Sequence, residues 1–271
     1  MPIRIATWNV NSIRLRIEMV MRISKWVKPD VFCFQEIKCR EAEFPFSALK
    51  SMGYEHFAIN AQKGYHGVAI ASRVPIKQIA SHDFCKRGEA RHINVSLDAP
   101  GMSFNDLTIH NFYVPAGGDI PNPEENKKFR HKLDFLEEMR DFFSVLGEQE
   151  KNRVVLVGDL NVAPLDCDVW NHKALLSVVS HTAEEVERLE SLFHVFGGSD
   201  PIRLRWPVPD RIFTWWSYRS PNWALANKGR RLDHIWISSE LTKTLGNVEI
   251  LKEVRGWERP SDHVPILVDL L

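Results

Sequence analysis

The stretch Val154-Val155-Leu156-Val157-Gly158-Asp159-Leu160-Asn161 decides how the rest of the chain is interpreted. Four consecutive apolar residues, most of them β-branched, are typical of a strand buried on both faces of a sheet. The glycine allows a sharp turn or a close approach, and an acid and an amide follow it. Ligands bind at the carboxyl ends of strands in open α/β sheets, but Asp and Asn also cap ordinary loops. From this octapeptide alone, both interpretations stay open.

Composition limits the class of protein. The chain has 271 residues, 44% hydrophobic and 26% charged, which is typical of a globular protein with a sizeable core. The net charge is zero, so any binding of nucleic acid must rest on a local basic patch. The four cysteines form no C-x-x-C pair, which favours reduced thiols over a zinc site or disulfides. No signal peptide or membrane-length apolar run is visible, so we expect a cytoplasmic protein with no membrane association and with access to a nucleoid.

Hydrophobic periodicity predicts one domain over residues 1–271, with no linker. Its two roughly similar halves would each be a strand-rich sheet with helices outside, and the two sheets would pack face to face. The expected strands are 3–10, 30–36, 54–60, 67–72, 75–82, 92–98, 107–114, the strand that begins at Val154, 232–238, 247–254 and 264–270. The expected helices are 14–28, 44–52, 124–146 and 184–196.

Polar residues recur where the apolar runs stop, each expected to follow or end a strand. They are Asn9, Glu36, Tyr113, Asp159, Asn161, Asp233, Asp262 and His263. Singly, each is more often a turn former, a cap or a solvated strand end, but the joint pattern predicts one cleft. Several acids in one cleft repel one another unless a cation lies among them, and oxygen ligands favour Mg²⁺ or Mn²⁺ over zinc. Such a set suits phosphate-ester hydrolysis, with an Asp or His activating water.

Six short motifs carry a resemblance to a known family. They are Thr7-Trp8-Asn9-Val10-Asn11, Phe34-Gln35-Glu36-Ile37-Lys38, Tyr113-Val114-Pro115, Gly158-Asp159-Leu160-Asn161-Val162-Ala163, Arg231-Leu232-Asp233-His234 and Pro260-Ser261-Asp262-His263-Val264-Pro265. In this order they resemble the exonuclease III family of abasic-site endonucleases, within the deoxyribonuclease-I-like endonuclease/exonuclease/phosphatase superfamily. The metal and histidine motifs are common to the superfamily, so they specify phosphoester hydrolysis. More specific to DNA repair are residues 36–38, 158–163 and 213–219.

The resemblance implies an α/β (α+β) four-layered sandwich of two packed β-sheets flanked by helices. It implies Mg²⁺-dependent cleavage 5′ to abasic sites in double-stranded DNA, trimming of 3′ ends by exonuclease and phosphatase activities, and a monomer. The implied metal residues are Glu36 with Asn9 and Asn11 close by and Asp262 in support. The implied catalytic residues are Asp159 and Asn161 on the attacking water, His263 paired with Asp233 at the phosphate, and Tyr113 as a donor to it. Whether Asp159 or His263 is the base stays open.

Two expectations concern the geometry of residues 154–161. Asp159 and Asn161 stand two apart, so on an extended chain both would face one side and hold one water. Gly158 would leave room for the substrate to approach.

Residues 203–231 are rich in basic and aromatic side chains, which suits phosphate contacts and a sugar pocket. The alternative is a core loop with inward Trp and solvated Arg residues. We expect Trp216 to be buried in the core and Trp215 to face the pocket. By family position, Leu232 would also line this pocket, and Arg14, Gly64 and Tyr65 would contact the DNA backbone.

Two positions depart from the family pattern. Ala116 replaces a usual amide, so one phosphate donor would be missing or replaced by Asn122 or by the backbone of Gly117-Gly118. Arg230 stands where a large apolar residue is common, which would favour 3′-end trimming over abasic incision. The rival interpretations are an enzyme that mainly trims 3′ ends, a phosphoesterase that acts on phosphomonoesters or lipids rather than DNA, and a DNA-binding module without activity.

Overall fold

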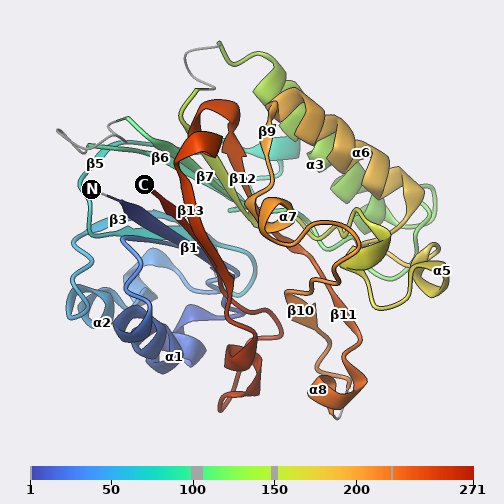
Figure 1. Cartoon of the computed structure of the whole chain (residues 1–271). Coiled ribbons are helices and arrows are strands. Elements are labelled where there is room, and N and C mark those ends of the chain that lie inside the picture. Colours follow the sequence, from blue (N-terminus) through green and yellow to red (C-terminus); the bar gives the residue numbers. More distant parts are fainter. Residues whose placement is uncertain (1, 99–105, 148–151, 221) are drawn as a thin grey trace.

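The computed structural model describes residues 2–98, 106–147, 152–220 and 222–271. Two mixed six-stranded sheets pack face to face, and helices cover both outer faces, so the expected four-layered sandwich is confirmed (Figure 1). The first sheet has the strand order β13 (Leu245–Ile250), β14 (Ile266–Leu270), β1 (Ile3–Asn9), β2 (Val31–Gln35), β4 (Val68–Ser72), β3 (His56–Asn60). The second has the order β5 (Ile76–Ala80), β6 (His92–Leu97), β7 (Thr108–Tyr113), β8 (Val154–Asp159), β12 (Asp233–Ser238), β9 (Gly198–Ser199).

The helices separate by face. α1 (Ile13–Trp26) and α2 (Phe46–Lys50) cover the first sheet, while α3 (Lys127–Ser144) and α6 (Ala183–Phe196) cover the second (Figure 1). Shorter elements connect these layers. They are α5 (His172–Leu175), α7 (Pro201–Arg205), α8 (Trp223–Ala226), the hairpin β10 (Trp215–Trp216) and β11 (Gly229–Arg230), and 3-10 turns at Glu41–Glu43, Phe84–Lys86, Asp166–Asp168, Ser239–Thr244 and Lys252–Gly256. Among the described residues, none of the helices has the length and apolar character needed to span a membrane.

Strand β8 contains the apolar run 154–157, and these residues pack on both faces of the sheet. Val155 and Val157 pack into the core between the two sheets, while Val154 and Leu156 pack under the helices on the outer face. All six residues of β8 are buried. A strand between two apolar layers needs apolar residues on both faces, so the prediction of a doubly buried strand is confirmed.

The two predicted halves are not contiguous in the chain. Strand β14 pairs antiparallel with β1, so the C-terminal segment completes the sheet that the N-terminal segment begins. Each sheet has one central parallel pair, β1 with β2 and β7 with β8. The carboxyl ends of these four strands lie at one edge of the sandwich, which places their polar residues together.

The helix bounds differ from the predicted ones at their ends. The helix predicted over 124–146 is α3, Lys127–Ser144, because Asn126 caps it and its side chain accepts from Lys128 N. Helix α6 begins at Ala183, where Thr182 and Glu185 form a reciprocal capping box. The strand predicted over 247–254 ends at Ile250, and a 3-10 turn takes over at Lys252.

Candidate active site

The polar residues predicted from strand ends do meet in one place, but not all of them end strands. Asn9, Tyr113 and Asp159 are the last residues of their strands. Asp233 begins β12 instead, and His263 precedes β14. The expectation that each follows a strand is therefore wrong for these two and for Asp262. Because β12 and β14 run antiparallel to their neighbours, their starting ends reach the same edge, and Asp233 pairs in register with Asp159.

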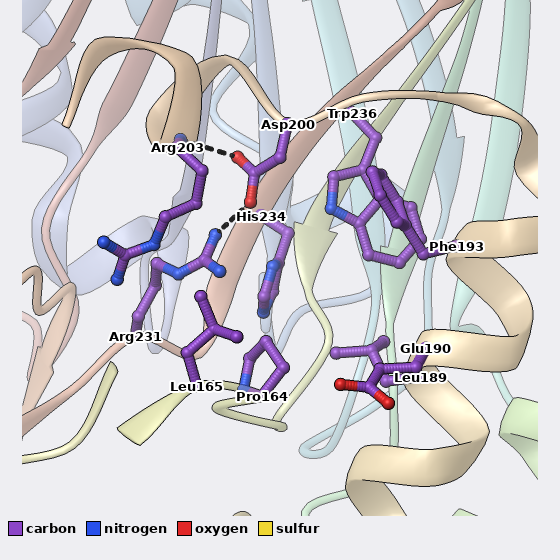
Figure 2. A pocket seen from close by; sticks show the side chains of 10 residues that line it. All are labelled: Pro164, Leu165, Leu189, Glu190, Phe193, Asp200, Arg203, Arg231, His234 and Trp236. Atoms are coloured by element: carbon purple, nitrogen blue, oxygen red, sulfur yellow. Dashed lines mark hydrogen bonds and ion pairs between the residues drawn. The ribbon is translucent and has the colours of Figure 1, made fainter. Parts of the chain in front are cut away.

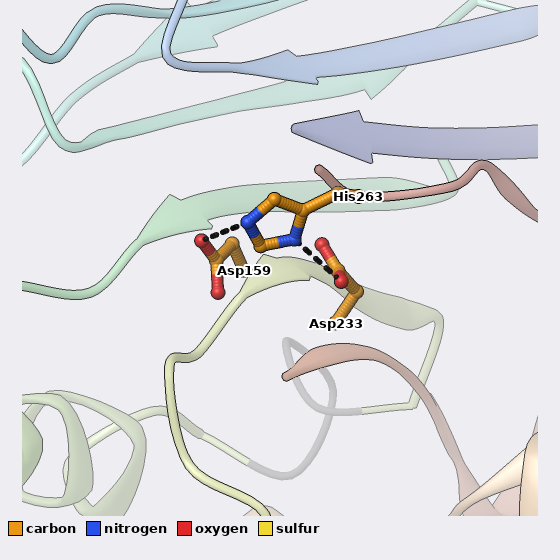
Figure 3. Close-up of side chains that lie close together, drawn as sticks. All are labelled: Asp159, Asp233 and His263. Carbon is orange, nitrogen blue, oxygen red and sulfur yellow. Dashed lines mark hydrogen bonds and ion pairs between the residues drawn. The ribbon is translucent and has the colours of Figure 1, made fainter. Parts of the chain in front are cut away.

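His263 lies between two carboxylates (Figure 3). Its Nδ1 lies 2.8 Å from Asp233 Oδ2, and its Nε2 lies 3.7 Å from Asp159 Oδ2. Thr214 Oγ1 also donates to Asp233 Oδ2, at 2.6 Å, which fixes that carboxylate. All three members of the cluster are buried. A carboxylate that holds Nδ1 orients the ring and leaves Nε2 toward the cleft.

Burial and charge set the protonation of this cluster. Burial raises the pKa of Asp159 to about 7, with the neighbouring His263 working against the rise and Asp233 adding to it. Burial alone would lower the pKa of His263, but the charges of Asp233 and Asp159 raise it to about 10. The two flanking carboxylates therefore favour the protonated form of the imidazole, and burial favours the protonated form of the Asp159 carboxyl.

Asn9 bridges the two sheets at the site. Its Nδ2 donates to Glu36 Oε1 at 3.0 Å and to Asp159 Oδ2 at 2.9 Å. Its Oδ1 accepts from Asn11 N at 3.0 Å. The Asn9 amide thus presents hydrogens to both carboxylates, and a metal-ligand role for its oxygen stays a prediction.

Asn161 lies beside Asp159, but not for the reason that the sequence suggested. Asn161 Nδ2 donates to Asp159 Oδ2 at 3.1 Å and to Val114 O at 2.9 Å. The backbone is not extended here, since Asn161 has a φ of 56°, in the left-handed region. A tight turn after β8 brings the amide back onto the carboxylate, and Asn161 N donates to Asp159 Oδ1 at 3.0 Å.

Gly158 also has a different role from the expected one. A Cβ at this position would lie 2.0 Å from Phe112 O, in the parallel neighbour β7, and the glycine has a φ of 143°. The missing side chain therefore makes room for the adjacent strand and not for a substrate. Close pairing of β7 and β8 at this point brings Tyr113 alongside Asp159.

Glu36 is the main residue expected to bind a cation, and Lys38 and Asn11 lie beside it. Lys38 Nζ lies 2.6 Å from Glu36 Oε2 and donates to Asn11 Oδ1 at 2.6 Å, so a positive charge already sits between these two oxygens. Asn11 Nδ2 donates to Asp262 Oδ1 at 3.2 Å. Carboxylate and amide oxygens are ligands that a hard divalent cation prefers. Glu36, Asn11 and Asp262 would supply such oxygens, and a cation at this place stays a prediction.

Tyr113 is a neutral hydrogen-bond donor at the same edge. Burial first, and then the charges of Glu36 and Asp159, raise its pKa well above the ordinary value, and its hydroxyl hydrogen-bonds with Glu36. Arg91 lies over the ring, 4.9 Å from its centre. The centre of the His66 ring lies 6.2 Å from that of the Tyr113 ring and 6.0 Å from that of the Tyr65 ring. His66 therefore connects the Gly64–Tyr65 loop to the site.

The aromatic and basic segment divides between core and cleft. Trp216 is 1% exposed and lies in the core, whereas Trp215 borders a cavity of about 840 Å³. Trp215 Nε1 donates to Asp262 Oδ2 at 2.9 Å, and Trp215 forms a β-bridge with His263, so the cavity adjoins the Asp159–Asp233–His263 cluster. Leu232 belongs to the apolar cluster against which Trp215 packs, and it is absent from the described residues that line the cavity.

Two arginines of the 203–231 segment, the buried Arg231 and the half-buried Arg203, pair with an internal acid. Arg231 is 1% exposed, and its Nε and Nη2 donate to both oxygens of the buried Asp168, at 2.6 and 3.0 Å. Arg203 pairs with the same carboxylate. These guanidinium groups neutralise a buried acid and are not available to DNA. Sequence reasoning missed this because Asp168 lies 63 residues from Arg231.

Arg230 and Ala116, the two residues that depart from the family pattern, differ in their surroundings. Arg230 Nη1 donates to Val179 O at 2.9 Å and to Ser180 Oγ at 2.6 Å, and its guanidinium lies 5.3 Å from the Trp215 ring centre in the cavity wall. The side chain of Ala116 is exposed. Asn122 Nδ2 donates to Glu125 Oε1 at 2.8 Å and its Oδ1 accepts from Glu124 N at 3.0 Å, and a role for Asn122 in place of the missing amide stays a prediction.

The expected DNA contacts are exposed, as such contacts must be. The Arg14 side chain is 50% exposed and pairs with Glu43, Tyr65 is 74% exposed, and Gly64 has open space at its Cα. Their contact with DNA stays a prediction.

One buried group under the site gave no signal in the sequence. Lys132, on α3, is fully buried, pairs with Glu185 and donates from Nζ to Asn161 O at 2.7 Å. A single lysine on an amphipathic helix resembles a solvated residue, so only the fold reveals that it anchors the turn after Asp159.

Comparison with known proteins agrees with this geometry. The chain belongs to the Endonuclease/Exonuclease/phosphatase family, whose model matches residues 6–263. It is 30% identical over 267 residues to exodeoxyribonuclease III of Haemophilus influenzae, covering 96% of this chain and 97% of that protein. The resemblance to exonuclease III enzymes is thereby confirmed, and the chain is an enzyme of the nuclease and phosphodiesterase class.

Solved structures show the same fold. An AP endonuclease from Archaeoglobus fulgidus superposes with a TM-score of 0.88 at 29% identity, covering 98% of both chains. A 3′ phosphatase from Neisseria bound to a product DNA hairpin superposes with a TM-score of 0.87 at 27% identity, covering 99% of both chains.

Proposed function

We propose that this enzyme is a DNA repair nuclease that cleaves the phosphodiester 5′ to abasic sites and trims 3′ ends. The buried Asp159–His263–Asp233 cluster beside the Trp215 cavity carries the proposal, because it sets two acids and a histidine next to a cavity with aromatic and basic walls, which suits a nucleic-acid substrate. The names of the relatives support both activities, since they include exodeoxyribonuclease III, an AP endonuclease and a 3′ phosphatase with product DNA.

The environment of the cluster supports Asp159 as the base and His263 as a donor to the phosphate. A carboxyl with a pKa near neutrality, held by Asn9 and Asn161, suits Asp159 as the group that orients and deprotonates the attacking water. His263, kept protonated by two carboxylates, suits donation from Nε2 to the phosphate oxygens. Tyr113, kept neutral by burial and acidic neighbours, can donate to the same phosphate.

Nucleases of this family generally depend on a divalent metal ion, and we propose Mg²⁺, with Mn²⁺ able to substitute. When bound, such an ion would neutralise negative charge on the phosphate and on the leaving oxygen. Glu36 would hold it, with Asn11 and Asp262 in support. Lys38 would have to release Glu36 Oε2 to make room for the ion.

A second candidate is an enzyme that mainly trims 3′ ends, and Arg230 favours it. A guanidinium in the wall of the Trp215 cavity gives that wall a positive charge where a purely apolar surface would select an abasic sugar. A monomeric state and a cytoplasmic location also stay predictions.

The test is a duplex with a single abasic site, incubated with Mg²⁺ or with EDTA. Nicking 5′ to the abasic site that requires Mg²⁺ supports the main proposal, and degradation only from 3′ ends supports the second candidate. Hydrolysis of small phosphomonoesters alone would indicate a phosphoesterase that does not act on DNA. Binding of the duplex without any cleavage would indicate an inactive DNA-binding protein.

A further inference from the structure

The ammonium group of Lys132 lies at a buried junction of three loops. The side chain is fully buried, and it packs beneath Gly117, where a Cβ would lie 2.9 Å from Lys132 Cδ. Its Nζ pairs with Glu185 and donates to Asn161 O at 2.7 Å and to Ala116 O at 3.4 Å. An ammonium group has three hydrogens, so these three acceptors use all of them.

Two of these acceptors follow the central parallel strands of the second sheet. Ala116 lies on the loop after β7, shortly beyond Tyr113, and Gly118 of the same loop lines the Trp215 cavity. Asn161 lies on the turn after β8. The ammonium group therefore contacts both of the loops that leave these strands at the edge where the site lies.

Glu185 extends the junction to the third loop, residues 176–182. Its two carboxylate oxygens each accept from Ser180 N at 2.9 Å, and Oε2 also accepts from Thr182 N at 3.1 Å. Ser180 Oγ in turn accepts from Arg230 Nη1 at 2.6 Å, in the wall of the Trp215 cavity. The buried ion pair thus connects the turn after β8 with one wall of that cavity.

The turn after β8 needs such a support, because its backbone is in an unfavourable region. Asn161 has a φ of 56°, where side chains other than glycine are uncommon. Its Nδ2 reaches Asp159 Oδ2 at 3.1 Å only from this turn. The hydrogen bond from Lys132 to the Asn161 carbonyl fixes the peptide group that follows Asn161, and so it holds the carboxamide against Asp159.

Packing of helix α6 does not explain the charged pair. The helix is held on the sheet by apolar side chains, since the Phe193 and Trp236 rings meet edge to face, with centres 4.9 Å apart at 62°, and Leu189 belongs to the same cluster (Figure 2). A buried ion pair contributes little net stability, because removing two charges from water offsets their attraction. An apolar pair could fill the same space, but it could not donate to the carbonyl groups of two loops.

We propose that Lys132, paired with Glu185, is a positioning residue for Asn161 in the nuclease reaction. It holds the turn that carries Asn161, and through Glu185 it joins this turn to the Arg230 wall of the cavity. The inference rests on the proposed nuclease function and deepens it, because it assigns a role in DNA cleavage to a side chain that is buried away from the substrate.

Lys132→Met and the double variant Lys132→Met/Glu185→Gln separate positioning from stability. The single variant leaves the Glu185 charge buried without its partner, so Tm should fall by roughly 10 °C. Gln at 185 removes that charge and keeps a capping acceptor, so the double variant should recover most of the lost Tm. We expect kcat for duplex cleavage to stay roughly 10–100-fold below wild type in both variants, with KM changed less than about threefold.

Lys127→Met, at an exposed position of the same helix, is the matched control and should keep the wild-type kcat. The side-chain amide of Asn161, followed by NMR in protein labelled with ¹⁵N-asparagine, gives a readout that does not require activity. Its resonances should shift in both Lys132 variants and stay in place in the control.

Recovery of kcat together with Tm in the double variant would overturn the proposal, because the pair would then be structural only. Unchanged Asn161 side-chain resonances in both Lys132 variants would overturn it as well. A wild-type protein that cleaves no DNA would instead refute the proposed function, and the Asn161 resonances would still decide whether Lys132 positions this side chain.

Discussion

The imidazole Nδ1 of His263 lies 2.8 Å from Asp233 Oδ2, in a site from which water is almost excluded. The carboxylate accepts from Nδ1 and so aims Nε2 at Asp159 and the cleft. Asp233 is itself held by Thr214, so the ring orientation depends on a chain of two hydrogen bonds.

Replacement Asp233→Asn keeps the shape of this contact but removes its charge. We expect kcat for DNA cleavage to fall by roughly 10²–10⁴, because the imidazolium loses the partner that stabilises and orients it. The measurement is single-turnover cleavage with Mg²⁺. Asp269→Asn, in the Arg4 ion pair on the far strand β14, is the matched control and should retain activity. A loss below about fivefold in Asp233→Asn would show that this contact is structural only.

Asp159→Asn and His263→Asn test the two reacting groups separately. Each should lower kcat by several decades, the size expected for loss of a base or of an oxyanion donor. Binding of the duplex, followed by fluorescence anisotropy, should change far less than kcat. A variant that keeps more than about a tenth of the wild-type kcat would be excluded from the mechanism.

Arg230→Leu tests the charge in the cavity wall. We expect the ratio of abasic incision to 3′→5′ exonuclease activity to rise about tenfold, because an apolar wall suits a sugar without a base. Lys228→Leu is the control, since Lys228 also lines the cavity but lies over Trp170 and not over Trp215. If the ratio is the same in Arg230→Leu as in the wild type, Arg230 does not select the substrate.

Gly158→Ala tests the close pairing of β7 and β8. A Cβ 2.0 Å from Phe112 O forces the strands apart, so we expect the free energy of unfolding to fall by more than about 4 kcal/mol. Gly64→Ala has a φ of 79° but nothing within 4 Å, so it should cost only about 1–2 kcal/mol. Urea denaturation measures both, and equal costs would contradict the steric explanation.

The ion pairs of the buried Asp168 should make the free energy of unfolding fall in acid. Burial alone would raise its pKa, but Arg231 and Arg203 hold the pKa below its ordinary value of 3.8. Because the unfolded state binds this proton more readily, the stabilisation is full above that ordinary value and is lost as the pH falls through the lower folded value.

Asp168→Asn should therefore flatten the dependence of unfolding free energy on pH below about 4, relative to the wild type. At neutral pH it should cost about 3 kcal/mol, because Arg231 stays buried with Asp200 alone. The exposed Asp134→Asn is the control and should follow the wild-type curve. The same acid dependence in Asp168→Asn as in the wild type would contradict this assignment.

The sequence by itself determined the layers of the fold. Apolar runs such as residues 154–157 predict buried strands, and the 3.6-residue period of α3 and α6 predicts covering helices, because both depend on near neighbours in the chain. Motif matches were enough to indicate the enzyme class and to group Asn9, Tyr113, Asp159 and His263 in one cleft.

Only the tertiary structure decided how each of these groups is placed and paired. Asp233 and His263 reach the site from the starting ends of antiparallel segments, and Asn161 reaches Asp159 through a left-handed turn. Arg231 is an internal counter-ion, and Lys132 anchors the catalytic turn. Partners such as Arg231 and Asp168 lie 63 residues apart. Pairing across such distances is set by strand order and burial, which no local pattern of residues encodes.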